Sequence, residues 1–243
     1  MAGHSKWSQI KRKKAVLDRQ RGKVISKHIR AIQSAVRSGG SGDPSVNLPL
    51  KNALAAAKTD NVPIDNIDRA VERALGGGEG SNFEEVLYEG YGPGGVAMLV
   101  EALTDNRNRT VGEVRHVFTK HGGNLSGSTA WQFDTKGLVV VEGDHDGLED
   151  VAIDLGAEDI ELEEGAVSIY TVPTQLFEFV EGLQAKGFET AVAQLTRVPQ
   201  TQTPVPDDDA RKVINLMEAL EDLDDVQNVY STADLDNVEY VGQ

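Results

Sequence analysis

The sequence predicts an α+β protein of three lobes, in which the third lobe is inserted into the second. Residues 21–78 repeat apolar side chains at helical spacing between glycine breaks. Residues 135–204 alternate strands and helices in a complete unit. The stretches 79–134 and 205–243 each hold strand and helix patterns that need a partner, so we expect them to form one middle α+β domain. A basic N-terminal arm, residues 1–20, precedes these domains.

Three short helices are predicted in the N-terminal helical domain. The first runs from Gly22, with apolar residues at three- and four-residue steps, and ends at Gly39–Gly40. The second carries Pro49 in its first turn, and the third follows Pro63 and stops at Gly76–Gly78. The inward stripe of the third helix is predicted to be Ile64, Ile67, Val71 and Leu75. Short helices joined by short loops are typical of a helical bundle.

The middle domain is predicted to begin with a β-hairpin. Two strand-like runs, EVLYEGY and VAMLVEAL, flank the turn at Gly92–Gly95. The glycines from Gly90 onward also match G-x-G-x-x-G, but a strand follows them instead of a helix, so we assign them to hairpin geometry and not to a dinucleotide site. A helix follows, with Thr110 and Glu113 placed as a capping box, and ends at Gly122–Gly123.

The inserted domain is predicted to be ferredoxin-like, because residues 137–198 read β-α-β-β-α-β. A proline-rich polar linker, PQTQTPVPDDD, leads out of it to an acidic amphipathic helix and a last strand, VQNVYST. This helix and strand need partners, and the hairpin and helix of residues 84–122 supply them. The middle domain is therefore expected to be discontinuous.

Positive charge is concentrated at the start of the chain. Residues 1–40 hold eleven Lys/Arg and one acid, a net charge of +10, whereas residues 76–243 hold nine Lys/Arg and thirty-three acids, a net charge of −24. A basic segment on an acidic body favours a polyanionic partner, because neutralising phosphates releases condensed counterions. One hypothesis is that the arm folds back onto the acidic lobes when no ligand is bound.

The basic arm holds most of the residues that we predict to contact nucleic acid. Lys11–Lys14 form a cluster whose long side chains can reach several phosphates. Trp7 either stacks on a base or anchors the arm to the body, and both interpretations stay open. The predicted contacts of the arm and the residue that follows it are Lys6, Trp7, Lys11, Arg12, Lys13, Lys14, Arg19 and Arg21.

Two further groups of cations are predicted to contact nucleic acid outside the arm. Lys23, Lys27 and Arg30 share one face of the first helix, away from its apolar stripe, so we expect this face to be free for a ligand. Arg107 and Arg109 come just before a predicted helix N-terminus. They form either a phosphate cradle or part of an ordinary strand-to-helix turn.

We predict no catalytic residues, no metal site and no cofactor. The chain has no cysteine, which excludes disulfides and thiolate ligands. Glu113 and His116 have a spacing used in metal sites, but there is no second such pair, and Asp144–Gly147 begins like a calcium loop without its closing glutamate. No apolar run approaches the ~20 residues of a membrane span, and the N-terminus does not resemble a signal peptide. We expect a cytoplasmic protein that is not an enzyme and has neither a small-molecule substrate nor a membrane partner.

The opening MAGHSKWSQIKRKKAVLDRQRGKVISK resembles the start of the YebC family. The similarity continues through NVPIDNIDRAV, YEGYGPGGVAMLVEALTDNRNRT and GGNLSGSTAWQFD, and covers essentially the whole chain. The family's members are described as probable transcriptional regulatory proteins, and the mitochondrial translational activator of cytochrome oxidase is related to them. The resemblance implies a helical domain, a middle α/β domain and an inserted ferredoxin-like domain. Because no transit peptide precedes MAGHSKW, a bacterial member is expected.

The resemblance, together with the charge distribution, implies a cytosolic, nucleic-acid-binding regulator of gene expression. The first interpretation is a transcriptional regulator that binds duplex DNA. The alternative is a ribosome-associated translation factor that binds ribosomal RNA and relieves stalls on proline-rich sequences. Both need a surface that binds polyanions, so the sequence leaves the choice between DNA and RNA open.

Overall fold

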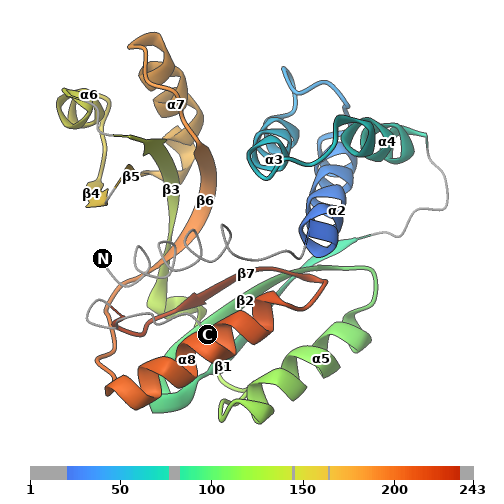
Figure 1. The fold of residues 1–243 in the computed structure, drawn as a ribbon, viewed down its shortest axis with the longest axis vertical. Coiled ribbons are helices and arrows are strands. Elements are labelled where there is room, and N and C mark those ends of the chain that lie inside the picture. The colour runs from blue at the N-terminus through green and yellow to red at the C-terminus, as the bar shows by residue number, and fades with distance from the viewer. Residues whose placement is uncertain (1–20, 77–82, 144–145, 164, 236–243) are drawn as a thin grey trace.

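The computed structural model describes residues 21–76, 83–143, 146–163 and 165–235, which form three lobes (Figure 1). A helical lobe and a lobe built on a four-stranded sheet stand side by side in this view. The middle lobe, built on a three-stranded sheet, lies beneath them both. The predicted α+β fold class, with a discontinuous middle domain and an inserted ferredoxin-like domain, is confirmed.

The helical lobe consists of α2 (Arg21–Gly39), α3 (Leu48–Thr59) and α4 (Ile64–Leu75). Asn47 caps α3: its side-chain oxygen accepts a hydrogen bond from the Leu50 N–H. The three helices bury one common core, in which these residues are fully buried or nearly so: Ile32, Ala35, Val36, Leu50, Ala57, Val62, Ile67 and Ala70.

The inward stripe predicted for α4 was partly wrong. Ile67 is buried and Val71 packs against the core, but Ile64 and Leu75 are 69% and 56% exposed. These two residues are the first and last of α4. The core contacts of α4 are made by its middle turns, where the small side chain of Ala70 is buried between the helices.

The middle lobe contains a three-stranded antiparallel sheet in the order β1-β2-β7. β1 (Glu84–Tyr91) and β2 (Ala97–Thr104) form the predicted hairpin around the short helix η1 (Pro93–Gly95). Gly94 and Gly95 both have positive φ, 73° and 74°, which explains why this turn needs glycine. The third strand of the sheet, β7 (Val226–Ser231), comes from the second of the two chain segments that form the discontinuous domain.

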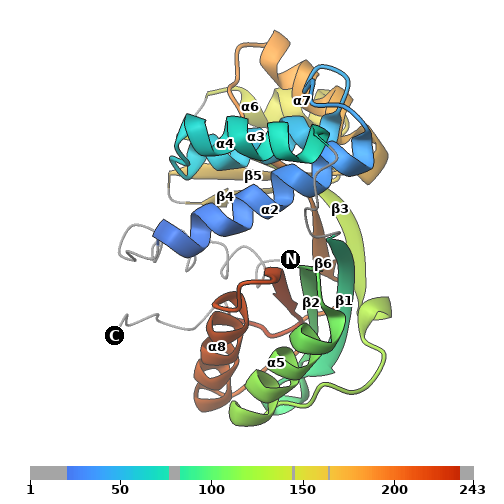
Figure 2. The same ribbon diagram turned by 90° about the vertical axis from the view of Figure 1, so that its right-hand side faces the viewer.

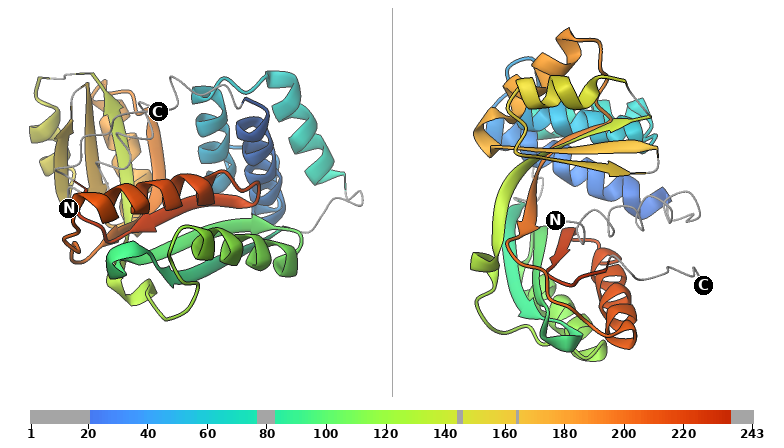
Figure 3. Two further views of the ribbon diagram at one scale, coloured as in Figure 1. Left: turned by 60° about the horizontal axis from the view of Figure 1, so that its bottom comes forward. Right: turned by 90° about the vertical axis from the view of Figure 1, so that its left-hand side faces the viewer.

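Two helices, α5 (Arg107–Lys120) and α8 (Asp207–Glu221), cover one face of this sheet and lie side by side (Figures 2 and 3). Their apolar stripes pack on the buried side chains of β2 and β7 in a single core. Phe118 of α5 and Leu216 of α8 are completely buried in it. Truncating either side chain to Ala is expected to cost about 2–5 kcal/mol of stability.

The start of α5 differs from the sequence-based prediction. The helix begins at Arg107, and its N-cap is Asn106, whose side chain accepts a hydrogen bond from the Arg109 N–H. The predicted capping box of Thr110 and Glu113 was therefore wrong. Thr110 lies inside the helix, completely buried, because its hydroxyl serves a tertiary contact described below.

The inserted lobe follows the predicted β-α-β-β-α-β order: β3 (Phe133–Glu142), α6 (Leu148–Asp154), β4 (Asp159–Glu163), β5 (Ala166–Thr171), α7 (Leu176–Ala185) and β6 (Val192–Pro199). Short helices η2 (Ala130–Gln132) and η3 (Pro173–Gln175) precede β3 and α7. The antiparallel sheet has the order β4-β5-β3-β6, which is that of the split βαβ arrangement. α6 and α7 pack on one face of it.

The lobes are joined by side-chain contacts as well as by the chain. β3 and β6 run from the inserted lobe toward the middle lobe (Figure 1), where the Arg197 Nε of β6 donates to the Glu101 Oε1 of β2 at 3.2 Å. The Tyr230 hydroxyl of β7 donates to the same carboxylate at 3.1 Å. On the other side, the Lys51 Nζ of α3 lies 4.9 Å from the centre of the Phe177 ring of α7. The helical lobe thus touches the inserted lobe directly.

Among the helices that the structure describes, none has the combination of length and apolar character needed to cross a bilayer.

Candidate nucleic-acid interface

The predicted contacts of the basic arm lie outside the described residues: Lys6, Trp7, Lys11, Arg12, Lys13, Lys14 and Arg19. Arg21 is the first residue of α2. The roles given to these residues therefore stay predictions.

The basic face of α2, formed by Lys23, Lys27 and Arg30, lies against the end of α8. The Lys23 Nζ donates to the Asp222 carbonyl at 3.1 Å, and the Lys27 Nζ donates to the Glu221 carbonyl. Arg30 donates through Nη1 to the Asp224 carbonyl. The structure therefore brings the three side chains together as predicted, but their face is engaged by residues 221–225 instead of being free for a ligand.

The end of α8 explains why cations gather there. The last turn of a helix carries unpaired carbonyls and a partial negative charge. α8 has no basic residue in its last turn, and Glu221, Asp222 and Asp224 add to the negative charge at this end. The cations of α2 therefore offset the negative charge at the C-terminal end of α8, because the last turn of α8 holds no basic residue.

Asp225 is the centre of this contact, and its side chain is only 2% exposed. The Arg30 Nη1 lies 3.1 Å from the Asp225 Oδ1. On the other oxygen, the Arg109 Nη2 donates at 2.6 Å, the Thr110 hydroxyl at 2.7 Å and the Thr104 hydroxyl at 3.2 Å. The buried carboxylate of Asp225 thus contacts both Arg30 and Arg109, which the sequence had placed in two separate groups.

The environment keeps Asp225 ionised. Burial by itself opposes ionisation, but the hydrogen bonds from Arg109 and Thr110 and the charges of Arg109 and Arg30 outweigh it and lower the pKa of the carboxyl. The hydrogen bonds to Asp225 and Asp105 raise the pKa of Arg109 in turn. The carboxylate of Asp225 and the guanidinium of Arg109 are therefore both charged at neutral pH.

The loop before α5 was predicted to be a phosphate cradle or a plain turn, and its two arginines have different surroundings. Arg109 is held by Asp225 and by Asp105, at 2.9 Å. Arg107 is 62% exposed and has a longer contact of 3.6 Å with Glu84. Of the two, Arg107 is the one available to a phosphate in this conformation, and Arg109 is committed to the Asp225 network.

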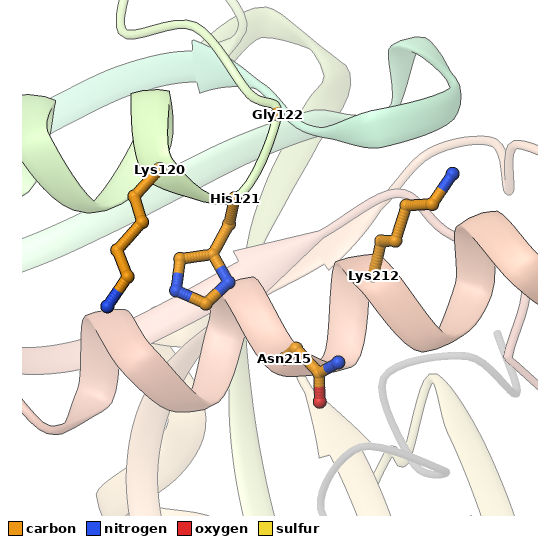
Figure 4. Close-up of a pocket in the computed structure, with 5 residues that line it drawn as sticks. All are labelled: Lys120, His121, Gly122, Lys212 and Asn215. Carbon is orange, nitrogen blue, oxygen red and sulfur yellow. The ribbon is translucent and has the colours of Figure 1, made fainter.

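A shallow hollow between the end of α5 and α8 was not identified from the sequence. It has a volume of about 470 Å³ and is lined by Lys120, His121, Gly122, Lys212 and Asn215 (Figure 4). Burial, and then the charge of Lys120, lower the pKa of His121. The Lys212 Nζ donates to the Asp209 carboxylate at 2.8 Å. No local pattern marks this site, because its lining comes from two helices that are distant in the sequence.

The hollow is an open surface that carries two lysines, and not an enclosed pocket. In Figure 4 the side chains of Lys120 and Lys212 extend in opposite directions, with His121 and Asn215 between them. Such an arrangement suits contacts with an extended anion better than the enclosure of a small ligand. In the parts of the chain that the structure describes, no three His, Asp or Glu side chains gather in a group that could hold a metal ion.

Comparison with known proteins gives matches over nearly the full chain. A family model described as "TACO1/YebC protein N-terminal domain" matches residues 5–77, and one described as "TACO1/YebC second and third domain" matches residues 83–233. A Deinococcus radiodurans protein named "Probable transcriptional regulatory protein" is 55% identical over 238 residues, which cover 97% of this chain and 98% of that protein. A Thermus thermophilus protein of the same description is 53% identical over 242 residues, 98% of this chain and 99% of its own.

A solved structure is similar as well. The crystal structure of a conserved hypothetical protein from Aquifex aeolicus superimposes with a TM-score of 0.85 at 45% sequence identity. The match covers 93% of this chain and 94% of the Aquifex chain. The arrangement of the three lobes is therefore shared with an experimentally determined relative.

Proposed function

Because the chain belongs to the TACO1/YebC family, we propose that it is a cytoplasmic regulator of gene expression that acts by binding duplex DNA. The names of its relatives support a regulatory role in transcription. The observation that carries the proposal of a nucleic-acid ligand is the charge distribution, a net +10 in residues 1–40 against −24 in residues 76–243. Binding by such a segment is driven by the release of counterions from phosphates.

We assign the primary contact to the arm and the first turns of α2, and a secondary contact to exposed cations of the middle lobe. The secondary set is Arg107 at the start of α5 and the two lysines of the hollow, Lys120 and Lys212. These side chains carry no base-reading pattern, so the contacts position the protein on the phosphate backbone. Any sequence preference would then come from DNA shape or from the arm itself.

Crosslinking in cells, with sequencing of both the bound DNA and the bound RNA, tests the nature of the ligand. Enrichment at promoters is expected. Enrichment at ribosomal RNA instead would replace this function with that of a ribosome-associated translation factor, since that factor would use the same cations on a different polyanion.

A second test asks whether the arm makes the phosphate contacts. Replacing Lys11, Arg12, Lys13 and Lys14 with Gln should weaken DNA binding and reduce the slope of log affinity against log salt by about 3–4, since each phosphate contact contributes roughly 0.9. The melting temperature should stay nearly unchanged. Lys186→Gln, an exposed cation of the inserted lobe, is the control and should leave affinity unchanged. An unaltered affinity in the fourfold variant would refute the arm's role.

A further inference from the structure

The contact between the helical lobe and the middle lobe is polar. Lys23, Lys27 and Arg30 donate to residues 221–225, and Arg30 also lies 5.9 Å from the centre of the Phe83 ring. Within the described part of the chain, no hydrophobic cluster contains side chains from both lobes. An interface held by hydrogen bonds from cationic side chains and by the Arg30–Asp225 ion pair is one that competing anions can loosen.

The contact is also asymmetric at Asp225. Its Oδ2 accepts from Arg109, Thr110 and Thr104, all of which belong to the middle lobe itself. Its Oδ1 faces Arg30 of the helical lobe at 3.1 Å, and this oxygen is without a well-directed hydrogen bond. The middle lobe can therefore keep its own hydrogen bonds to Asp225 when Arg30 moves away. The contact of Asp225 with Arg30, which joins the two lobes, is weaker than the contacts of Asp225 within the middle lobe.

We propose that residues 221–225 occupy the basic face of α2 in place of a phosphate backbone, and that nucleic acid, by competing for the same side chains, releases the helical lobe from the middle lobe. This inference rests on the proposed function and adds a regulation to it. We call the arrangement in this structure the closed form and residues 221–225 the acidic loop. In the closed form, the acidic loop shields the basic face of α2, which is part of the proposed nucleic-acid-binding surface. The cost of displacing that loop lowers the apparent affinity for nucleic acid.

The geometry suits a phosphate backbone as a competitor. Lys23, Lys27 and Arg30 lie on consecutive turns and span about 10 Å of helix at 1.5 Å per residue. This span covers several phosphates of one strand, which follow each other at about 3.4 Å along the duplex axis. The acceptors in the closed form are mostly neutral carbonyls, whereas a phosphate would supply charge-assisted hydrogen bonds, which are stronger.

The side chains at the contact are within reach of a competitor. Lys23 is exposed at the edge of the contact, and the Arg30 side chain is 22% exposed. A polyanion can therefore engage Lys23 first and then draw away Lys27 and Arg30. Because coupling between two binding events is reciprocal, a change in residues 221–225 that weakens the internal contact should strengthen nucleic-acid binding.

Energy transfer between the lobes tests the release. The chain has no cysteine, so Glu72→Cys in α4 and Asn108→Cys in α5, both at exposed positions, give two unique labelling sites in the full-length protein. A short random-sequence DNA duplex is then titrated in, while fluorescence anisotropy of a labelled duplex measures binding in parallel. We expect transfer efficiency to fall as the DNA binds, with the same midpoint.

Paired variants test the competition. Asp222→Asn with Asp224→Asn removes two exposed charges from the acidic loop and leaves Asp225 in place. This pair should lower the transfer efficiency of the free protein and tighten DNA binding about three- to fivefold, the range for exposed charge interactions. Asp154→Asn with Glu181→Gln removes the same charge from exposed positions of the inserted lobe and should change neither quantity.

The outcomes separate this inference from the proposed function. DNA that binds with constant transfer efficiency, or equal affinities for the two paired variants, would overturn the competition and leave the proposed function standing. A wild-type protein that shows no anisotropy change with DNA would overturn both.

Discussion

Arg109 donates from Nη2 to the Asp225 Oδ2 at 2.6 Å and so joins the first turn of α5 to the loop that follows α8. The two residues come from the two separate stretches that make up the middle domain. Since Arg30 lies against the other oxygen of the same carboxylate, this pair is also one of the points at which the helical lobe contacts the middle lobe.

Replacing Asp225 with Asn should destabilise the protein. The variant keeps the volume of the side chain but removes the charge that Arg109 and Arg30 share in a nearly water-free site. We expect the free energy of unfolding to fall by about 2–4 kcal/mol, as for the loss of one partner from a buried ion pair. Urea unfolding followed by circular dichroism measures it. The neighbouring Asp224→Asn, at an exposed position, is the control, with an expected change below about 0.5 kcal/mol.

The stability of the protein should depend on pH through Asp225. The pKa of this carboxyl is lowered from its ordinary value of 3.8, so the folded state binds the proton less readily than the unfolded chain does. Its stabilising contribution is therefore complete above the unfolded pKa of 3.8 and is lost as the pH falls through the lower folded pKa. Unfolding free energies measured from neutral to strongly acidic pH should fall more steeply below pH 3.8 in wild type than in Asp225→Asn. Parallel curves would contradict this assignment.

Lys120→Gln should raise the pKa of His121. Burial contributes the larger part of the lowering and the charge of Lys120 the next, so removing that charge should move the pKa part of the way back toward 6.5. NMR titration of the imidazole Hε1 resonance measures the shift, and Lys186→Gln is the distant control. Bound DNA should raise the same pKa in the wild-type protein if the hollow faces phosphates. An unmoved resonance in Lys120→Gln would mean that burial alone sets the pKa.

Gly90→Ala should destabilise the middle lobe. A Cβ at this position of β1 would lie 2.6 Å from the Asn124 carbonyl oxygen and 3.0 Å from the Phe118 ring, so the loop after α5 would have to move. We expect a loss of about 1–3 kcal/mol, as for overpacking in a core. Gly112→Ala is the matched control: nothing lies within 4 Å of the new Cβ, and α5 should gain about 0.5–1 kcal/mol in helix propensity. Thermal unfolding of the two variants should therefore shift in opposite directions.

The sequence was sufficient for most of the architecture because its elements are locally encoded. The GPGG turn, the glycine breaks after the helices and the β-α-β-β-α-β order each come from short patterns, and the structure contains all of them. The start of α5 was placed incorrectly because Thr110 followed by Glu113 has the form of a capping box. Asn106 caps the helix instead, and the Thr110 hydroxyl is used by Asp225, 115 residues further along the chain.

The basic face of α2 shows the limit of sequence analysis at the candidate site. The spacing of Lys23, Lys27 and Arg30 correctly placed them on one face. What lies against that face could not be predicted, because the acceptors are main-chain carbonyls nearly 200 residues away, and every residue type carries the same carbonyl. The hollow between α5 and α8 was missed for the same reason: its residues meet only through the packing of two distant helices.

The position of β2 has a consequence for synthesis of the protein. β2 is the centre strand of its sheet, with β1 as one neighbour and β7 as the other, and the whole inserted lobe is translated between β2 and β7. We therefore expect the helical lobe and the inserted lobe to fold during translation. One edge of β2 stays without a partner strand until β7 has been synthesised. An unpaired edge of this kind invites pairing with other chains. A chain that stops before Val226 should be insoluble, even though it contains two complete lobes.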